Sequence, residues 1–483
     1  MDRLLARPGL ALGLVLLLLV LWRFFAGLDA GLGLSVDEAQ YYLWSREPAW
    51  GYFSKPPLIA WVIAATTQVC GHAEPCIRLP ALLAFAATSW VVMLIARRLF
   101  DARIGVFSGL AFATLFLTSF YSWFMTTDSL LLLCWSLALL FFLRALDTDH
   151  WRDWLLFGLF LGLGLLAKYA MGFFVLCACL ALLVEDRARL RSLRLWAALT
   201  LALLILAPNL AWNLEHEFAT LRHTAEISQL NRELFRPASF LKFSLAQFLV
   251  MGPFLLPAFA LAAFERQAWS RERAQRLLVF FSVPVLALFL LLALLSRANA
   301  NWAAAAYVAA TPLTIAWLAR RNHRRWLALA LAANLLMAAA LYHWHRLAPA
   351  GAPDPFQQTR GWKAAGQSLA HALEATGCRT IIAYGRAALV ELTYYSSRAL
   401  GEAVAPLSYV PDGRIRHHFH LVADIARRPF DCAILIEGDE ARLRQEFAEV
   451  RPLAPLSLPN EAAPVPLWYV QGFKGYVGAS AGR

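Results

Sequence analysis

The chain has 483 residues, of which 60% are hydrophobic and only 16% are charged. Soluble proteins carry about 25% charged residues, so this composition excludes an ordinary soluble protein. The formal net charge of +12 would favour nucleic-acid binding in a soluble chain. Here the basic residues cluster in short loops between apolar runs, which is the pattern of cytoplasmic loops in membrane proteins.

Repeated apolar runs of roughly 16–22 residues predict a polytopic α-helical membrane protein. No small-residue cleavage site follows the first run, so we expect a retained helix and not a signal peptide. We expect about eleven transmembrane helices, at residues 8–25, 79–96, 104–120, 128–144, 153–167, 170–184, 195–212, 243–264, 277–295, 302–319 and 326–345.

One set of connecting loops is strongly basic, and the opposite set is longer and poorer in basic residues. The positive-inside rule therefore predicts a cytoplasmic amino terminus. It places the loops around Asp37, Asp128, Lys168 and Arg297, and the carboxyl-terminal tail, on the outer side. The basic set comprises Arg3, Arg7, Arg97, Arg98, Arg103, Arg144, Arg152, Arg187, Arg189, Arg191, Arg194, Arg266, Arg271, Arg273, Arg276, Arg320, Arg321, Arg324 and Arg325.

The composition changes after Arg346, where a Pro- and Gly-rich linker covers residues 349–355. We therefore expect two domains, a membrane module over residues 1–345 and a small soluble α/β domain over residues 346–483. Residues 362–376 have helical periodicity, and residues 380–384, 432–436 and 466–470 are short strand-like runs.

The seven cysteines divide by predicted topology. Cys134, Cys177 and Cys179 lie within spans, where a thiol is usually a small buried apolar group. The other four lie on the outer side, where Cys70–Cys76 and Cys378–Cys432 are possible disulfides. A zinc site using Cys70, His72, Glu74 and Cys76 is the alternative, although its spacing is not a standard one.

The most informative residues follow the first span, in the runs Asp37-Glu-Ala-Gln-Tyr-Tyr42 and Gly51-Tyr-Phe-Ser-Lys-Pro-Pro57. Ser35 and Glu38 fit a capping box, so Asp37 and Glu38 belong either to a helix start or to a catalytic site, and both can hold together. Lys55 precedes two prolines that restrict its backbone, which suits phosphate binding. Its alternative is a lysine that reaches toward lipid headgroups.

Asp128 opens a very apolar span, where an aspartate favours the helix N-terminus. Lys168 lies between two apolar runs, and a cation there needs a partner or water. Lys55, Arg78, Lys168 and Arg297 are the cations expected near the outer ends of the core spans. As a set they would counter an anionic headgroup such as a phosphate or pyrophosphate.

Several signatures of soluble enzymes are absent from the sequence: a Gly-Lys-Ser/Thr phosphate loop, a GxGxxG turn and a GxSxG elbow. These absences argue against an ATP-driven pump. No clear cluster of metal ligands is visible, so no cofactor is assigned and a requirement for a divalent metal ion stays open.

The order of these motifs resembles that of the GT-C membrane glycosyltransferases. The resemblance rests on Asp37-Glu-Ala-Gln-Tyr-Tyr42, Gly51 to Pro57, Arg78-Leu-Pro80, Thr126-Thr-Asp128 and Asn301-Trp-Ala-Ala-Ala-Ala-Tyr307, where Ala303 replaces the usual proline. Within that fold the chain looks like the bacterial relatives of protein O-mannosyltransferases and of lipid A aminoarabinose transferases, that is, glycosyltransferase families 39 and 83. The resemblance covers residues 8–345 well and the carboxyl-terminal tail only loosely.

The resemblance implies an enzyme that uses a polyprenyl-phosphate sugar and inverts the anomeric carbon. Asp37 matches the essential acidic residue, with Glu38 beside it and Asp128 as a second acid, and we expect all three to be catalytic. The donor phosphate would be bound by Lys55, Arg78, Lys168 and Arg297. The expected substrate-binding aromatics are Tyr41, Tyr42, Tyr52, Trp302 and Tyr307.

The predicted function is therefore transfer of a sugar from a polyprenyl-phosphate carrier to an envelope acceptor, which is lipid A, another glycan or a protein. The predicted location is a bacterial inner membrane with the active site facing the periplasm. A transporter or flippase of an anionic lipid-linked sugar is the alternative, but paired broken helices and internal repeats are not evident in the sequence. Neither the sugar nor the acceptor follows from the residues.

Overall fold

The computed structural model describes residues 8–228, 235–265, 272–349, 351–459 and 461–477. The predicted basic residues Arg3, Arg7, Arg266 and Arg271 lie outside this part. The chain divides into two compact units, of which unit 1 comprises residues 1–30 and 55–348 and unit 2 comprises residues 31–54 and 349–483. The expected domain boundary near residue 346 is therefore close to that of the units, whereas residues 31–54 join the carboxyl-terminal part of the chain.

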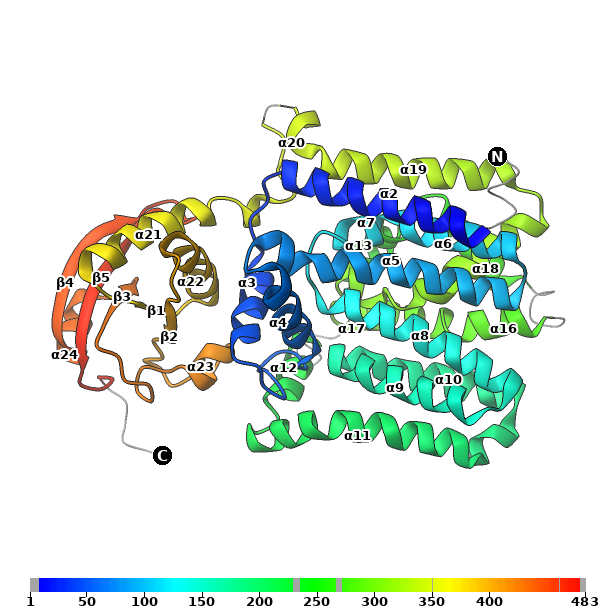
Figure 1. Ribbon diagram of the computed structural model, residues 1–483, viewed down its shortest axis with the longest axis horizontal. Coiled ribbons are helices and arrows are strands. Elements are labelled where there is room, and N and C mark those ends of the chain that lie inside the picture. The colour runs from blue at the N-terminus through cyan, green and yellow to red at the C-terminus, as the bar shows by residue number, and fades with distance from the viewer. Residues whose placement is uncertain (1–7, 229–234, 266–271, 350, 460, 478–483) are drawn as a thin grey trace. The chain divides into compact units, whose positions relative to one another are not determined.

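Unit 1 is helical, and its described helices correspond in order to the expected spans (Figure 1). They are α2 (Pro8–Asp29), α5 (Glu74–Leu99), α6 (Ala102–Thr114) with α7 (Phe116–Tyr121), α8 (Thr127–Thr148), α9 (Trp151–Ala167), α10 (Gly172–Glu185), α11 (Leu193–Glu215), α13 (Pro237–Val250) with α14 (Leu255–Phe264), α16 (Arg273–Phe280) with α17 (Val283–Leu295), α18 (Ala306–Arg320) and α19 (Arg324–Tyr342). The shorter helices α4 (Leu58–Cys70), α12 (Ala219–Ser228) and α20 (Trp344–Leu347) complete the unit.

Six helices of the described part are long and apolar enough to cross a membrane, and the bent pair α13–α14 would be a seventh. The difference from eleven has a physical reason, because several expected spans form shorter helices: α6 and α10 have only 13 and 14 residues. The count of eleven passes therefore stays a prediction, while the polytopic membrane fold is confirmed.

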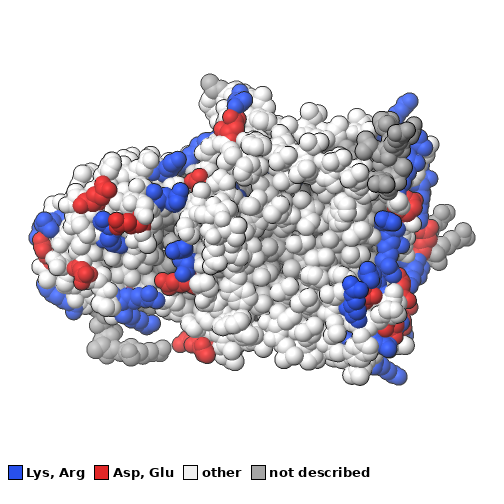
Figure 2. All heavy atoms as spheres, viewed as in Figure 1, with Lys and Arg blue, Asp and Glu red and all other residues white. Residues whose placement is uncertain are grey.

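Basic side chains gather at one end of unit 1, as Figure 2 shows, while the sides of its helices are almost free of charge. Ion pairs join the helices at this end. Asp147, near the end of α8, binds Arg98 of α5 at 2.7 Å and Arg273 of α16 at 3.1 Å, and Arg276 binds Glu185 of α10 at 2.5 Å. We name this the basic end. Residues predicted to share one side of the membrane thus lie together.

The α13–α14 pair bends by 106° at Gly252. Gly252 has a positive φ of 100°, and a Cβ at this position would lie 2.1 Å from Asn334 Oδ1, so a larger residue does not fit. α19 binds the backbone at the break: Asn334 Nδ2 donates to Met251 O at 3.4 Å and Trp326 Nε1 to Phe254 O at 3.0 Å. These bonds satisfy carbonyls that the break removes from the helix ladder.

Unit 2 contains a five-stranded mixed sheet with the order β2-β1-β3-β5-β4. β1 (Thr380–Ala383) pairs in parallel with β2 (Ala405–Ser408) and β3 (Cys432–Ile436), and β5 (Val465–Phe473) pairs antiparallel with β3 and β4 (Phe447–Leu456). The helices α21 (Trp362–Thr376) and α22 (Arg386–Leu400) pack on each other and on the sheet. Other helices are α3 (Val36–Arg46), α23 (His418–Val422) and α24 (Glu440–Glu446). The expected helix and three strands are therefore present.

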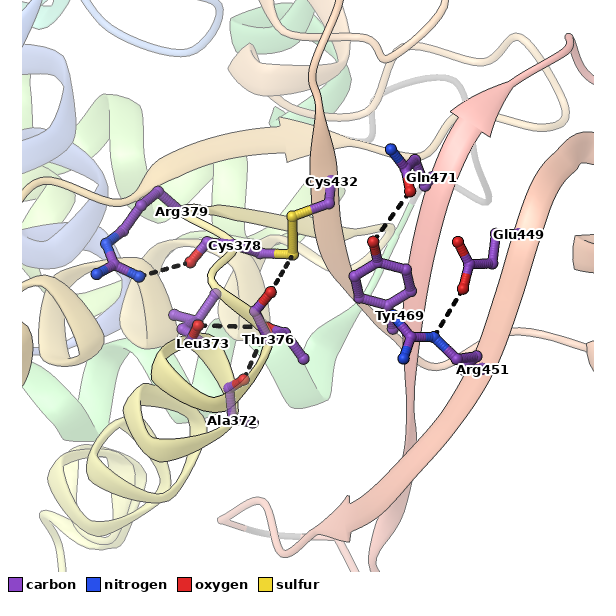
Figure 3. Close-up of a disulfide and its surroundings, with 10 residues drawn as sticks. All are labelled: Ala372, Leu373, Thr376, Cys378, Arg379, Cys432, Glu449, Arg451, Tyr469 and Gln471. Carbon is purple, nitrogen blue, oxygen red and sulfur yellow. Dashed lines mark hydrogen bonds and ion pairs between the residues drawn. A yellow bond between two sulfur atoms is a disulfide. The ribbon is translucent and has the colours of Figure 1, made fainter.

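Both expected disulfides are present. Cys378, before β1, is bonded to Cys432 at the start of β3 (Figure 3). In unit 1, Cys70 at the end of α4 is bonded to Cys76 in the first turn of α5. This bond leaves no thiolate at Cys70 or Cys76, so the zinc interpretation is wrong. The described free thiols are Cys134 and Cys177, both buried, and the exposed Cys179.

Candidate active site

A buried ion pair lies where α8 begins. Lys168 Nζ donates to Asp128 Oδ1 at 2.7 Å, and Asn301 Nδ2 donates to Asp128 Oδ2 at 2.7 Å. The side chains of Asp128 and Lys168 are only 5% and 19% exposed. We call these three residues the Asp128 cluster. Asp128 lies in the first turn of α8, but both of its carboxylate oxygens bind side chains from other elements, so it does more than start a helix.

Each partner of Asp128 comes from a place where a helix is interrupted. Lys168 ends α9 in an extended conformation, directly before the short 3-10 helix η1 (Tyr169–Met171). Asn301 belongs to another 3-10 helix, η3 (Ala300–Ala303). Polar groups at such breaks can bind side chains because the regular helix ladder does not occupy them.

Two further contacts support the Asp128 cluster. Beside Lys168, the Tyr169 hydroxyl donates to Asn209 Oδ1 at 2.6 Å and accepts from Asn213 Nδ2 at 3.1 Å, both asparagines being fully buried in α11. Beside Asn301, Gln247 of α13 donates to the Ala300 carbonyl at 3.3 Å and accepts from the Tyr307 hydroxyl at 2.6 Å. Both segments that carry the partners of Asp128 are thus fixed by buried hydrogen bonds.

The Asp128 cluster and the basic end lie at opposite ends of α8. That helix has 22 residues, which at 1.5 Å per residue separates its ends by about 30 Å. This length equals the thickness of the hydrocarbon core of a bilayer. The cluster therefore lies at the membrane surface opposite the basic end.

The other predicted residues of unit 1 lie in different surroundings. Arg78 is buried in α5, with its guanidinium 5.3 Å from the ring of Trp123 and 5.4 Å from the ring of Phe124. Lys55 is half-buried before the N-cap of α4. Arg297 is exposed and donates to the Ile227 carbonyl at 3.3 Å.

The two later aromatics differ in burial. Tyr307 is fully buried, and its hydroxyl donates to Gln247 Oε1. Trp302, next to Asn301, is half-buried with its ring 6.2 Å from that of Phe289. Trp302 is therefore the more accessible of the two to a ligand.

Asp37 belongs to unit 2, at the second position of α3. Arg386 Nη1, from the first residue of α22, donates to Asp37 Oδ1 at 2.8 Å and to Gln40 Oε1 at 3.4 Å. The side chains of Asp37 and Arg386 are 54% and 39% exposed, so the carboxylate stays accessible to solvent.

A close approach holds α3 on α22. The Leu34 N–H donates to the Tyr395 hydroxyl at 2.8 Å. A Cβ at Gly33 would lie 2.5 Å from the Thr359 carbonyl oxygen and 2.7 Å from the Tyr395 hydroxyl oxygen, so this approach requires glycine.

The predicted capping box is confirmed. Ser35 Oγ accepts from the Glu38 N–H at 3.4 Å, and Glu38 Oε2 accepts from the Ser35 N–H at 2.9 Å. Glu38 is fully buried, whereas its neighbour Asp37 points to solvent and to Arg386. The cap fixes the start of α3 and thereby the direction of the Asp37 side chain.

The three predicted tyrosines near Asp37 are buried in unit 2. Tyr52 stacks on Trp44 at 4.4 Å, and its hydroxyl donates to the Trp44 carbonyl at 3.0 Å. Tyr42 packs edge-on against Tyr394 at 5.0 Å, and Tyr41 lies 5.3 Å from Trp44. These contacts pack the residues around α3, the helix that carries Asp37. A direct role of the three tyrosines in binding substrate stays a prediction.

A group of basic side chains surrounds Tyr384, two residues before Arg386. The Arg416 guanidinium lies 5.2 Å from the Tyr384 ring, and the rings of His417 and His420 each contact the Tyr384 carbonyl, at 3.1 and 3.0 Å. Burial, followed by His420 and the nearby Arg386 and Arg416, lowers the pKa of His417 to about 3. His417 is therefore neutral at physiological pH.

The described residues contain no group of three or more His, Cys, Asp and Glu side chains that could hold a metal ion. Around Asp128 both carboxylate oxygens bind Lys168 and Asn301, and at Asp37 the neighbouring group is the cationic Arg386. The described residues of these two places therefore do not fit a metal site.

Arg386, Asn209 and Asn213 were not predicted from the sequence. The two asparagines had a detectable signal, because they lie four residues apart inside an otherwise apolar span. Arg386 had none, because it lies 349 residues from Asp37 and its neighbours in the sequence carry no motif.

The fold and the site define a polytopic membrane protein with a polar site at one membrane surface. A family model described as dolichyl-phosphate-mannose-protein mannosyltransferase matches residues 54–212. The fold resembles that of ArnT from Cupriavidus metallidurans, with a TM-score of 0.65, 16% sequence identity, and coverage of 94% of this chain and 97% of that one. An apo oligosaccharyltransferase from Archaeoglobus fulgidus gives a TM-score of 0.54 at 13% identity, with coverage of 82% and 64%.

The chain is 33% identical over 428 residues to the lipid A galacturonosyltransferase RgtD of Rhizobium johnstonii, which covers 87% of this chain and 89% of the relative. It is also 32% identical over 183 residues to the lipopolysaccharide core galacturonosyltransferase RgtA of that organism, which covers 37% of each chain. The chain therefore belongs to the GT-C membrane glycosyltransferases, in the family that includes RgtD. It is a glycosyltransferase, as predicted in preference to the transporter alternative.

Proposed function

We propose that this enzyme transfers a hexuronic acid from a polyprenyl phosphate to lipid A or to the lipopolysaccharide core, at the periplasmic face of the inner membrane. The observation that carries the proposal is the buried Lys168–Asp128 pair, which holds a cation about 30 Å from the basic end. Support for the donor class comes from an ArnT structure of the same fold that holds undecaprenyl phosphate. The names of RgtD and RgtA support the sugar and the acceptor.

Lys168 would stabilise the leaving phosphate, assisted by Arg78 and Lys55. As the bond between the anomeric carbon and the phosphate oxygen breaks, the phosphate takes the electron pair and gains negative charge. A cation that is already held in place stabilises this charge without reorganisation, which is the main source of electrostatic catalysis. Asp128 and Asn301 would serve as positioning residues for Lys168, because Asp128 accepts from the Lys168 ammonium through Oδ1 and from Asn301 Nδ2 through Oδ2.

Asp37 would accept the proton of the acceptor hydroxyl while the acceptor oxygen attacks the anomeric carbon from the side opposite the phosphate. This attack inverts the configuration. Asp37 suits the role because it is half-exposed and its direction is fixed by the capping box and by Arg386. With an ionised phosphate as acceptor, no deprotonation is needed, and Asp37 would instead orient the acceptor.

The test is an assay with the purified full-length protein, a synthetic polyprenyl-phosphate galacturonate and lipid A. We expect glycosylated lipid A and free polyprenyl phosphate in equal amounts, measured by mass spectrometry. A donor with a different sugar on the same carrier serves as the matched control for the sugar. Transfer from a nucleotide sugar and not from the lipid-linked donor would overturn the proposal.

A further inference from the structure

A groove of about 410 Å³ opens at the basic end of unit 1, on the other side of the bundle from the Asp128 cluster. The first two turns of α6, the last turns of α18 and the first two turns of α19 line it. None of the residues proposed for sugar transfer lines this groove. It therefore needs an explanation of its own.

The lining changes from charged to apolar along the helices. Arg103, Arg320 and Arg324 lie at the mouth, where the three helices end. Phe107, Ile315 and Leu331 lie deeper. Leu331 is seven residues beyond Arg324 in α19, so the apolar wall extends about 10 Å into the bundle.

Within the described residues, most of the positive charge at the mouth has no carboxylate partner. Within the described part of the chain, the side chains of Arg103 and Arg324 form no ion pair, unlike Arg98 and Arg276 at the same end of unit 1. The one carboxylate in the lining is that of Asp101, and its Oδ1 accepts from the Ile104 N–H at 2.8 Å as the cap of α6.

Arg320, the third arginine of the lining, is already occupied. It pairs with Glu272 and lies 5.3 Å from the ring of Phe100. Among the residues that the structure describes, the guanidinium groups of Arg103 and Arg324 are thus left without an ion pair at the entrance of an apolar groove.

We propose that this groove binds one anionic glycerophospholipid of the leaflet at the basic end. The lipid phosphate would bind Arg103 and Arg324, and an acyl chain would lie against Phe107, Ile315 and Leu331. Charge complementarity selects this occupant. A free phosphate would leave the apolar wall exposed to water, and a zwitterionic lipid would not neutralise the charge of Arg103 and Arg324. By the positive-inside rule this leaflet is the cytoplasmic one.

The experiment is native mass spectrometry of the purified full-length protein with phosphatidylglycerol and, separately, with phosphatidylcholine of the same acyl chains. We expect tight binding of one phosphatidylglycerol. The variant Arg103→Gln/Arg324→Gln should bind it about 30-fold more weakly, because each basic residue near an anionic lipid contributes on the order of 1 kcal/mol. Inorganic phosphate should not displace the lipid.

The matched control is Arg191→Gln/Arg325→Gln, which removes the same charge from exposed residues outside the groove. It should retain binding. Ala328→Trp fills the groove without changing charge, and it should weaken phosphatidylglycerol binding if the acyl chain lies there. Equal binding of both lipids, equal losses in the two double variants, or no loss with Ala328→Trp would each overturn the proposal.

Discussion

Asp37 in unit 2 and Asp128 in unit 1 look alike in the sequence but lie in opposite environments. Each is the second residue of a helix, and each follows a Ser or Thr at the N-cap. Asp128 is almost fully buried, with both oxygens bonded to side chains of other elements. Asp37 is half-exposed and has one ion pair. Similar local sequence therefore gives one aspartate that binds a buried cation and one that stays accessible to solvent.

The energetic consequence also differs between the two sites. Breaking a buried ion pair by removing one partner typically costs about 3–5 kcal/mol, because the other charge stays buried without compensation. Breaking an exposed pair costs about 0–1 kcal/mol. Substitutions at Asp128 should therefore act on stability and activity, and substitutions at Asp37 on activity alone.

The largest stability effect is expected for Asp128→Ala. It leaves the Lys168 ammonium buried without its carboxylate, so thermal unfolding in detergent should reveal a loss of about 3–5 kcal/mol. Asp147→Ala is the matched control, because Asp147 lies in the same helix and its ion pairs are exposed. Equal losses of stability in both variants would show that burial of the Asp128 cluster does not contribute to the free energy of unfolding.

The largest effect on chemistry without loss of stability is expected for Asp37→Asn. Removal of a general base typically lowers turnover about 10²–10⁴-fold. The melting temperature should stay close to that of the wild type, because the pair with Arg386 is exposed. Glu47→Gln, also on the surface of unit 2, is the control that should retain transfer. Near-normal single-turnover transfer by Asp37→Asn, with donor binding verified, would remove Asp37 from the mechanism.

The two units should respond differently to acid, because unit 2 contains a buried histidine that is neutral in the folded state. The pKa of His417 is lowered to about 3 in the folded state, against about 6.5 when unfolded. The unfolded chain therefore binds more protons between pH 6.5 and 3, and stability falls as the pH falls through this window. Between pH 7 and pH 5 the loss is about 2 kcal/mol.

The measurement is thermal unfolding of the full-length protein at both pH values. His417→Asn should reduce the difference between them. His371→Asn, which removes an exposed histidine of α21, should leave it unchanged. An identical acid response in wild type and His417→Asn would contradict this assignment.

The smallest effect is expected for Arg386→Gln. The exposed pair with Asp37 contributes about 0.2–1 kcal/mol, so turnover should fall less than tenfold, and Arg386→Lys should restore part of it. Arg398→Gln, on the same helix, is the control. If Arg386→Gln lowered turnover as far as Asp37→Asn does, Arg386 would be a catalytic residue itself and not a positioning one.

The sequence predicted those elements whose signal is local. Long apolar runs identified the helices of unit 1, and Ser35 with Glu38 identified the cap of α3. The strand β2 was missed because Pro406 lies inside a four-residue edge strand, and β4 was missed because Pro452 and Pro455 interrupt an exposed run. The helix α4 was missed because its 13 residues are too few to resemble a span.

The candidate site was predicted in composition and not in arrangement. Asp128 and Lys168 were both expected near the outer ends of spans, but their direct contact depends on how α8 and α9 pack. Arg386 could not be predicted from the sequence, because a surface arginine without a motif is indistinguishable from many others in the chain. Pairings between distant segments need the tertiary structure.

The assignment of residues 31–54 to unit 2 has a consequence for synthesis of the protein. Asp37 leaves the ribosome 349 residues before Arg386, and Leu34 leaves it 361 residues before Tyr395. At about 5–20 residues per second, this interval lasts roughly 20–70 s. The α3 segment therefore cannot pair with α22 until about four-fifths of the chain has been translated. A chain that ends before α22 would retain the described helices of unit 1 and still lack Arg386, the ion-pair partner of Asp37.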